Sequence, residues 1–194
     1  MDAKGPGGDA EAESSEEFLR FADIPMIREL LPEDAEPFAL VLRGHLLLEH
    51  ALIELLKHAL PRSQELKSRL SYQHRIELNV ATGLLPSDFA PFLEYVSELR
   101  NRYAHNLRFE LTVDDEAVLL GRVPAMVRHF AFEEESKEFP GGLRESLIAT
   151  YIAIAMTHWR LIDDAGRLGV VGKRSIRAML EAAFQARMAR PSDG

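Results

Sequence analysis

The most apolar stretch of the chain is residues 37–60, PFALVLRGHLLLEHALIELLKHAL. Pro37 suits the first turn of a helix and Pro61 ends one, because proline fixes φ and has no amide proton. Apolar side chains that recur at helical spacing or widen the stripe are Leu42, Leu46, Leu47, Leu48, Leu52, Ile53, Leu55, Leu56 and Leu60. So wide a stripe indicates a central helix buried on more than one side. We therefore expect an all-α fold built around it.

Helical patterns flank this stretch on both sides. Ser63 can cap a helix that ends at Gly83, and Phe89, Phe92, Val96 and Leu99 recur at helical spacing in the next one. A short helix at 18–31 is interrupted at Pro25, and residues 125–132 add a helical turn. The sequence predicts a helical bundle of about five main helices, at residues 37–60, 64–82, 88–105, 143–167 and 173–190.

Residues 107–124 break the helical pattern. Polar and apolar side chains alternate from Arg108 to Val113, which is typical of a strand with one buried face. Asp114-Asp115 is a turn signal, and the apolar residues 117–120 precede Gly121. We therefore predict a small β-hairpin insertion at about residues 107–124.

The acidity of the chain lies at its amino-terminal end. The net charge is −8, and residues 1–36 hold 11 acidic and three basic residues, which leaves 20 of each in the remainder. Residues 1–17 contain no large apolar residue after Met1, which predicts a disordered acidic tail. We assign residues 18–194 to a single domain. Residues 62–108 hold seven bases and five acids, a balance that permits RNA binding.

Composition excludes several kinds of site. The chain has no cysteine, which rules out disulfides, thiolate catalysis and zinc sites built on sulfur. No apolar run reaches the roughly 18 residues of a membrane span, and the amino terminus is acidic rather than signal-like. We therefore expect a soluble, cytoplasmic protein with no membrane partner and no cofactor.

Side chains that can bind anions or transfer protons are concentrated at residues 98–105, ELRNRYAH, where the predicted helix 88–105 ends. Arginine binds phosphate or carboxylate through a planar fork of donors, and histidine is easily poised for proton transfer near neutral pH. At about 100° per residue, Asn101 and His105 lie about 40° apart, whereas Arg100 lies about 140° from His105. Arg100 and His105 therefore converge only if the helix ends at His105 or if two chains meet.

The order Arg100-Asn101, three residues, then His105 resembles the signature of the HEPN superfamily, small all-helical domains of RNases, toxins and nucleotide-linked regulators. The resemblance covers roughly residues 38–108, and its layout is closest to the mannitol-operon repressor group. The further stretches that carry it are Arg43-Gly44-His45, Arg75-Ile76-Glu77-Leu78, Gly83-Leu84-Leu85-Pro86 and Phe92-Leu93.

The resemblance implies a homodimer in which the two motifs form one composite cleft. In a metal-independent endoribonuclease of this kind, the RNA 2′-hydroxyl attacks the adjacent phosphate and leaves a cyclic phosphate. His105 would transfer protons, Arg100 would neutralise charge on the phosphate, and Asn101 would orient either group. Arg102 and Tyr103 would position the substrate, and no residue is assigned to a metal.

The same residues fit a non-catalytic regulatory or protein-interaction module, which is the function we favour. In that case Arg100 pairs with an acidic neighbour, His105 caps the helix C-terminus where positive charge is favourable, and Asn101 bonds a free carbonyl. The expected partners are a second copy, another protein such as an antitoxin, or RNA. A metal-dependent hydrolase that uses His45, Glu49 or His74 is the least favoured class, because two ligands at i, i+4 spacing do not make a site.

Overall fold

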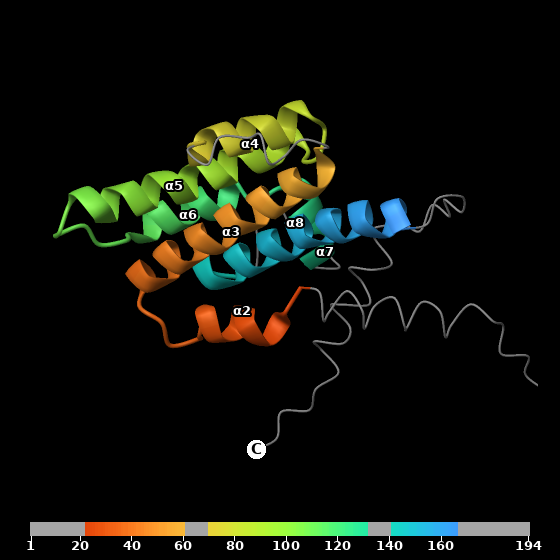
Figure 1. The fold of residues 1–194 in the computed structure, drawn as a ribbon. Coiled ribbons are helices and arrows are strands. Elements are labelled where there is room, and N and C mark those ends of the chain that lie inside the picture. The colour runs from red at the N-terminus through yellow and green to blue at the C-terminus, as the bar shows by residue number, and fades with distance from the viewer. Residues whose placement is uncertain (1–21, 61–69, 132–140, 167–194) are drawn as a thin grey trace, which may run out of the picture.

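The computed structural model describes residues 22–60, 70–131 and 141–166, and their regular structure is entirely helical. The α-helices of these ranges are α2 (Ile24–Leu30), α3 (Pro37–Ala59), α4 (Tyr72–Ala81), α5 (Ala90–His105), α6 (Val113–Gly121), α7 (Ala125–Ala131) and α8 (Leu143–Gly166), with a 3-10 turn η2 (Ser87–Phe89) before α5 (Figure 1). The predicted all-α class is confirmed. None of these helices is long and apolar enough to cross a membrane.

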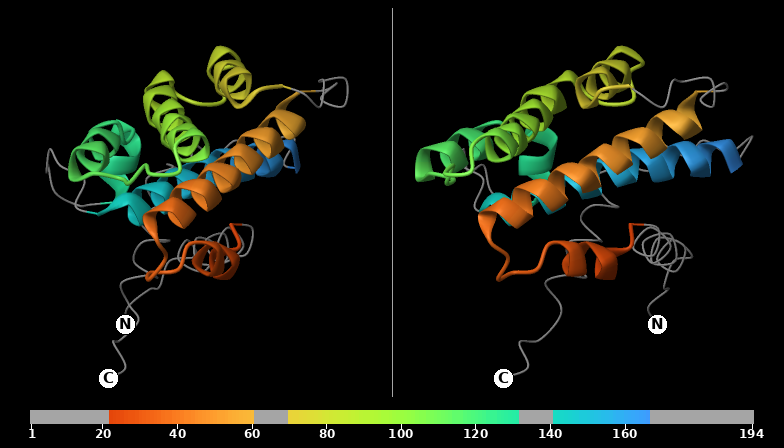
Figure 2. Two further views of the ribbon diagram at one scale, coloured as in Figure 1. Left: turned by 90° about the vertical axis from the view of Figure 1, so that its left-hand side faces the viewer. Right: turned by 60° about the vertical axis from the view of Figure 1, so that its left-hand side comes forward.

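The two longest helices, α3 and α8, form the centre of the bundle. They make the most extensive helix contact of the described residues, and they run side by side in all views (Figures 1 and 2). Gly44 of α3 faces Leu147 of α8 so closely that a Cβ atom there would lie 2.6 Å from the Leu147 Cδ1. The absence of a side chain at position 44 thus sets how near the two helices approach.

The remaining helices cover opposite sides of this pair. α4 and α5 lie on one side, α6 and α7 lie next to them, and α2 lies on the other side (Figure 2). Two arginines bind the C-terminus of α2 to the central helices. Arg43 of α3 donates to the Leu30 carbonyl, and Arg144 of α8 donates to the Leu31 carbonyl. The largest fully buried side chains of the resulting core include Leu48, Leu52, Leu55, Phe89, Phe92, Leu93 and Leu99.

Helix boundaries follow the local signals in most places. α3 begins at Pro37 and ends one residue before Leu60, as its apolar pattern predicts. α4 begins later than expected, where the Ser71 side chain accepts a hydrogen bond from the His74 amide, and the chain then turns at Gly83 with φ of 74°. α2 begins beside the expected interruption at Pro25, because proline is tolerated in a first helical turn, and it runs unbroken from Ile24 to Leu30.

The predicted β-hairpin at residues 107–124 is wrong, because residues 113–121 form α6. A capping box starts this helix: the Thr112 hydroxyl accepts from the Asp115 amide, and the Asp115 carboxylate accepts from the Thr112 amide. Asp114 and Asp115 thus belong to a first helical turn, where acidic residues are favourable, and not to a hairpin turn.

Several predictions fall outside the residues that the structure describes. They are the acidic tail at 1–17, the first part of the short helix at 18–31, the start of the helix at 64–82, and the helix at 173–190. The assignment of residues 18–194 to one domain also stays a prediction.

Candidate functional site

The motif residues Arg100, Asn101 and His105 are exposed on the last two turns of α5. Arg100 donates a hydrogen bond of 2.9 Å to the side-chain oxygen of Asn101. Among the described residues, neither Arg100 nor His105 forms an ion pair. The fold therefore leaves these three side chains available to another molecule.

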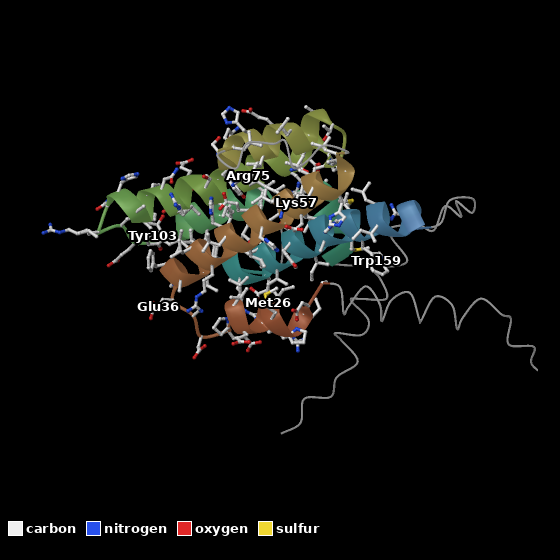
Figure 3. The ribbon with its side chains drawn as sticks, in the orientation of Figure 1. Met26, Glu36, Lys57, Arg75, Tyr103 and Trp159 are labelled. Atoms are coloured by element: carbon white, nitrogen blue, oxygen red, sulfur yellow. The ribbon has the colours of Figure 1, made fainter. Side chains whose placement is uncertain are left out.

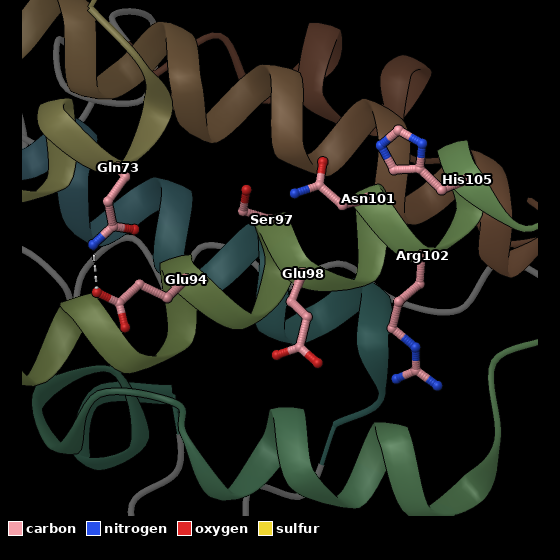
Figure 4. A pocket seen from close by; sticks show the side chains of 7 residues that line it. All are labelled: Gln73, Glu94, Ser97, Glu98, Asn101, Arg102 and His105. Atoms are coloured by element: carbon pink, nitrogen blue, oxygen red, sulfur yellow. Dashed lines mark hydrogen bonds between the residues drawn. The ribbon is translucent and has the colours of Figure 1, made fainter.

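Asn101 and His105 line one shallow, open depression of about 540 Å³ on the outer face of α5. Its other lining residues are Gln73, Glu94, Ser97, Glu98 and Arg102. Figure 4 shows Asn101 and His105 on the same side of the helix, as their spacing predicts, with Arg102 turned away toward α6. Two carboxylates in this lining make the depression a poor receptor for phosphate.

Arg100 does not line this depression. Its charge is near enough to α3 to be one of the smaller causes of the lowered pKa of the buried His45. Burial is the main cause that lowers the pKa of His45; Glu49 opposes this, and Arg100 and Arg75 add to it. This depression thus includes His105 but not Arg100, in agreement with the wide angle expected between them.

Arg102 is held by α6. Its guanidinium donates to Asp115 at 2.6 Å and lies 4.1 Å from the centre of the Phe109 ring. Burial alone would raise the pKa of Asp115, but hydrogen bonds from Arg102 and Thr112 outweigh it and lower the pKa to about 2. Tyr95 also donates to this carboxylate, at 3.2 Å. Arg102 therefore fixes the end of α5 against α6.

Tyr103 connects the end of α5 to α3 (Figure 3). Its ring packs edge-on against Phe38 and against Phe109, with centroid distances of 5.2 and 4.5 Å. Arg102 and Tyr103 thus have structural partners, and their predicted contact with a substrate stays a prediction.

The residues considered for a metal-dependent hydrolase, the least favoured function, do not come together in one site. His45 is buried and stacks on Tyr72, Glu49 pairs with Arg75, and His74 bonds Ser71. Within the described ranges, no group of three or more histidine or acidic side chains is placed to hold a metal ion.

One further surface feature is an exposed apolar stripe on α3, the helix whose wide apolar pattern the sequence also favours as a dimer surface. We call Phe38, Leu42 and Leu46 the α3 stripe. Phe38 and Leu46 keep 50 % and 54 % of their surface exposed, and Leu42 is half-buried. These three residues follow each other at intervals of four, so they lie on one face of α3. The dimer surface itself stays a prediction.

Searches among family models, curated proteins and solved structures found no match to this chain.

Proposed function

We propose that this chain is a HEPN-like domain, similar in layout to the mannitol-operon repressor group, that acts as a non-catalytic regulatory or protein-interaction module. The exposed α3 stripe is the observation that supports this most. Adjacent large apolar side chains on a surface mark a contact site, because their removal from water drives association. A cytoplasmic location belongs to the same proposal.

A second copy of the chain is the partner we propose for the α3 stripe. In a two-fold contact the same patch lies on both subunits, so the stripe would pack against its counterpart. The charge of Arg100 is near enough to α3 to act on His45, so Arg100 would border this contact. The arrangement would bring together motif residues that one chain keeps apart.

Leu46→Glu is expected to weaken self-association about tenfold or more, because a carboxylate buried in an apolar contact loses its hydration. Sedimentation velocity over a concentration series measures the effect. Val113→Glu is the matched control, since Val113 is 83 % exposed and lies off the stripe. A wild-type chain that stays monomeric at high concentration, or equal weakening by both variants, would contradict the proposed dimer.

A metal-independent endoribonuclease is the second candidate. The observation that favours it is the contrast within the motif: Arg102 and Tyr103 are tied into the fold, whereas Arg100, Asn101 and His105 are exposed. Exposed arginine and histidine are the groups that phosphate neutralisation and proton transfer require. Glu94 and Glu98 beside Asn101 count against it, so any cleft for RNA needs the second chain.

If this second candidate is correct, Arg100→Ala and His105→Ala each reduce RNA cleavage about 100-fold, the range of a lost charge stabiliser or proton donor. The assay follows a mixed RNA substrate in EDTA. Arg108→Ala, a change at an exposed arginine outside the motif, should cleave like wild type. A correctly folded, dimeric wild type that does not cleave RNA would leave the regulatory module as the function.

A further inference from the structure

Two histidines meet at the C-terminal end of α3, about two turns before α8 ends. The Nε2 atom of His158 lies 2.7 Å from the Nδ1 atom of His58, and the ring centroids are 4.4 Å apart. A hydrogen bond between two ring nitrogens needs one donor and one acceptor, so at least one ring must be neutral. Two protonated rings would present only donors and two positive charges to each other.

The surroundings of this pair decide which ring resists protonation. His158 is buried in the α3–α8 seam, whereas His58 is exposed. Burial is the main cause that lowers the pKa of His158, to about 4; His58 and His50 add to it, and Glu54 opposes it. Glu54 itself is engaged by Lys57 at 2.7 Å. Burial and the neighbouring groups of α3 together therefore disfavour protonation of His158.

Two arginines also belong to α8 or to a helix that packs on it, but neither is among the causes of the lowered pKa of His158. Arg160 follows His158 by two positions on α8 itself. α7, which also packs on α8, carries Arg128. Glu54 is thus the acidic side chain of α3 that favours a charged His158, and it is shared with Lys57.

We propose that His58 and His158 form a proton-sensitive latch, which joins the C-terminal end of α3 to α8 near neutral pH and opens in mild acid. His58 follows Lys57 in the last turn of α3, and His158 precedes Trp159 in α8; Figure 3 labels these two neighbours. The latch joins the two central helices at the C-terminal end of α3. The close approach of Gly44 and Leu147 joins them nearer their N-terminal ends. The inference is independent of the proposed function.

The direction of the effect follows from the lowered pKa. When the latch opens or the chain unfolds, His158 regains an ordinary pKa near 6.5. The open state therefore binds a proton more tightly than the closed state does. The closed state loses stability relative to the open state as pH falls from about 6.5 toward about 4. Above pH 6.5 the latch makes no pH-dependent contribution.

Urea unfolding of the full chain at pH 7.5, 6.5, 5.5 and 4.5 tests the latch. Glutamine can share a hydrogen bond without titrating in this range, so we expect the midpoints of His58→Gln and His158→Gln to fall less between pH 6.5 and 4.5 than that of wild type. His74→Gln, at an exposed histidine of α4, should follow wild type. Because His58 is exposed, its variant keeps the test usable if the buried substitution prevents folding.

A second readout separates a local latch from general acid unfolding. The NMR titration midpoint of His158 is expected well below 6.5 in wild type and higher in His58→Ala, since the neighbouring ring is one cause of the lowered pKa. Protection of the amides in the last turn of α3, corrected for the intrinsic exchange rate at each pH, should fall at pH 5 before the protection of α5 does. A His158 that titrates near 6.5, or midpoints that fall equally in all variants, would overturn the proposal.

Discussion

Replacing Asp115 by asparagine is expected to lower the free energy of unfolding by about 3 kcal/mol, in the range found when one partner of a poorly hydrated ion pair is removed. The carboxylate accepts hydrogen bonds from Arg102, Tyr95 and Thr112, and its side chain is only 11 % exposed. Asparagine loses the charge and places an amide donor among these donors. Because Arg102 is 38 % exposed, water can solvate it afterwards, which keeps the loss at the lower end of the range.

Asp114→Asn is the matched control for this change. Asp114 occupies the same first turn of α6 but is exposed, so its loss removes only the favourable interaction with the helix dipole, about 0.5 kcal/mol. Urea unfolding at pH 7 measures both variants. Equal losses at the two positions would show that the Arg102–Asp115 pair contributes nothing beyond the charge of the helix terminus.

The same carboxylate makes stability depend on acid pH. Its pKa is lowered from 3.8 to about 2 in the folded chain, so the unfolded chain takes up a proton first as pH falls. The contribution is fully present above about pH 4 and disappears as pH falls through 2, a change of about 2 kcal/mol. In Asp115→Asn the free energy of unfolding should lack this decrease below about pH 4. If it falls as steeply as in wild type, Asp115 is not the cause of the acid dependence.

The sequence was a good guide where one helix face carries a dense apolar stripe. α3, α5 and α8 were predictable from periodicity, because burial of these stripes decides their structure. α6 was not predicted, because the alternation of polar and apolar side chains in residues 108–113 is the pattern typical of a strand. The signal that decides the outcome is Thr112 with Asp115, a capping box that was available in the sequence but competes with the turn meaning of Asp114-Asp115.

For the candidate site, helical geometry predicted which side chains share a face but not what each one contacts. The shared side of Asn101 and His105 and the divergence of Arg100 follow from 100° per residue. The pairing of Arg102 with Asp115 depends on how α5 packs against α6, and the latch joins residues 100 positions apart. Such contacts arise from tertiary packing, which no local pattern encodes.

Gly44→Leu is expected to lower the free energy of unfolding by about 3 kcal/mol or more, the upper range for overpacking a core. Even a single Cβ would lie 2.6, 2.9 and 3.1 Å from the Cδ1, Cδ2 and Cγ atoms of Leu147, so the obstruction includes the branch point and not only the tip of the side chain. Leu147 is fully buried, so its side chain cannot relieve the clash by turning into solvent. Either α3 and α8 move apart or Leu147 leaves its preferred rotamer.

A graded series separates this clash from helix propensity. Gly44→Ala gains about 1 kcal/mol of propensity but still meets Leu147, so we expect a net loss of about 1 kcal/mol. Gly121→Ala, at the last residue of α6 with nothing within 4 Å of the new Cβ, shows the effect of an added methyl group without a clash. In a Leu147→Ala background the obstruction is gone, and Gly44→Ala should become neutral or stabilising. If the penalty persists there, the close approach of α3 and α8 does not depend on the Gly44–Leu147 contact.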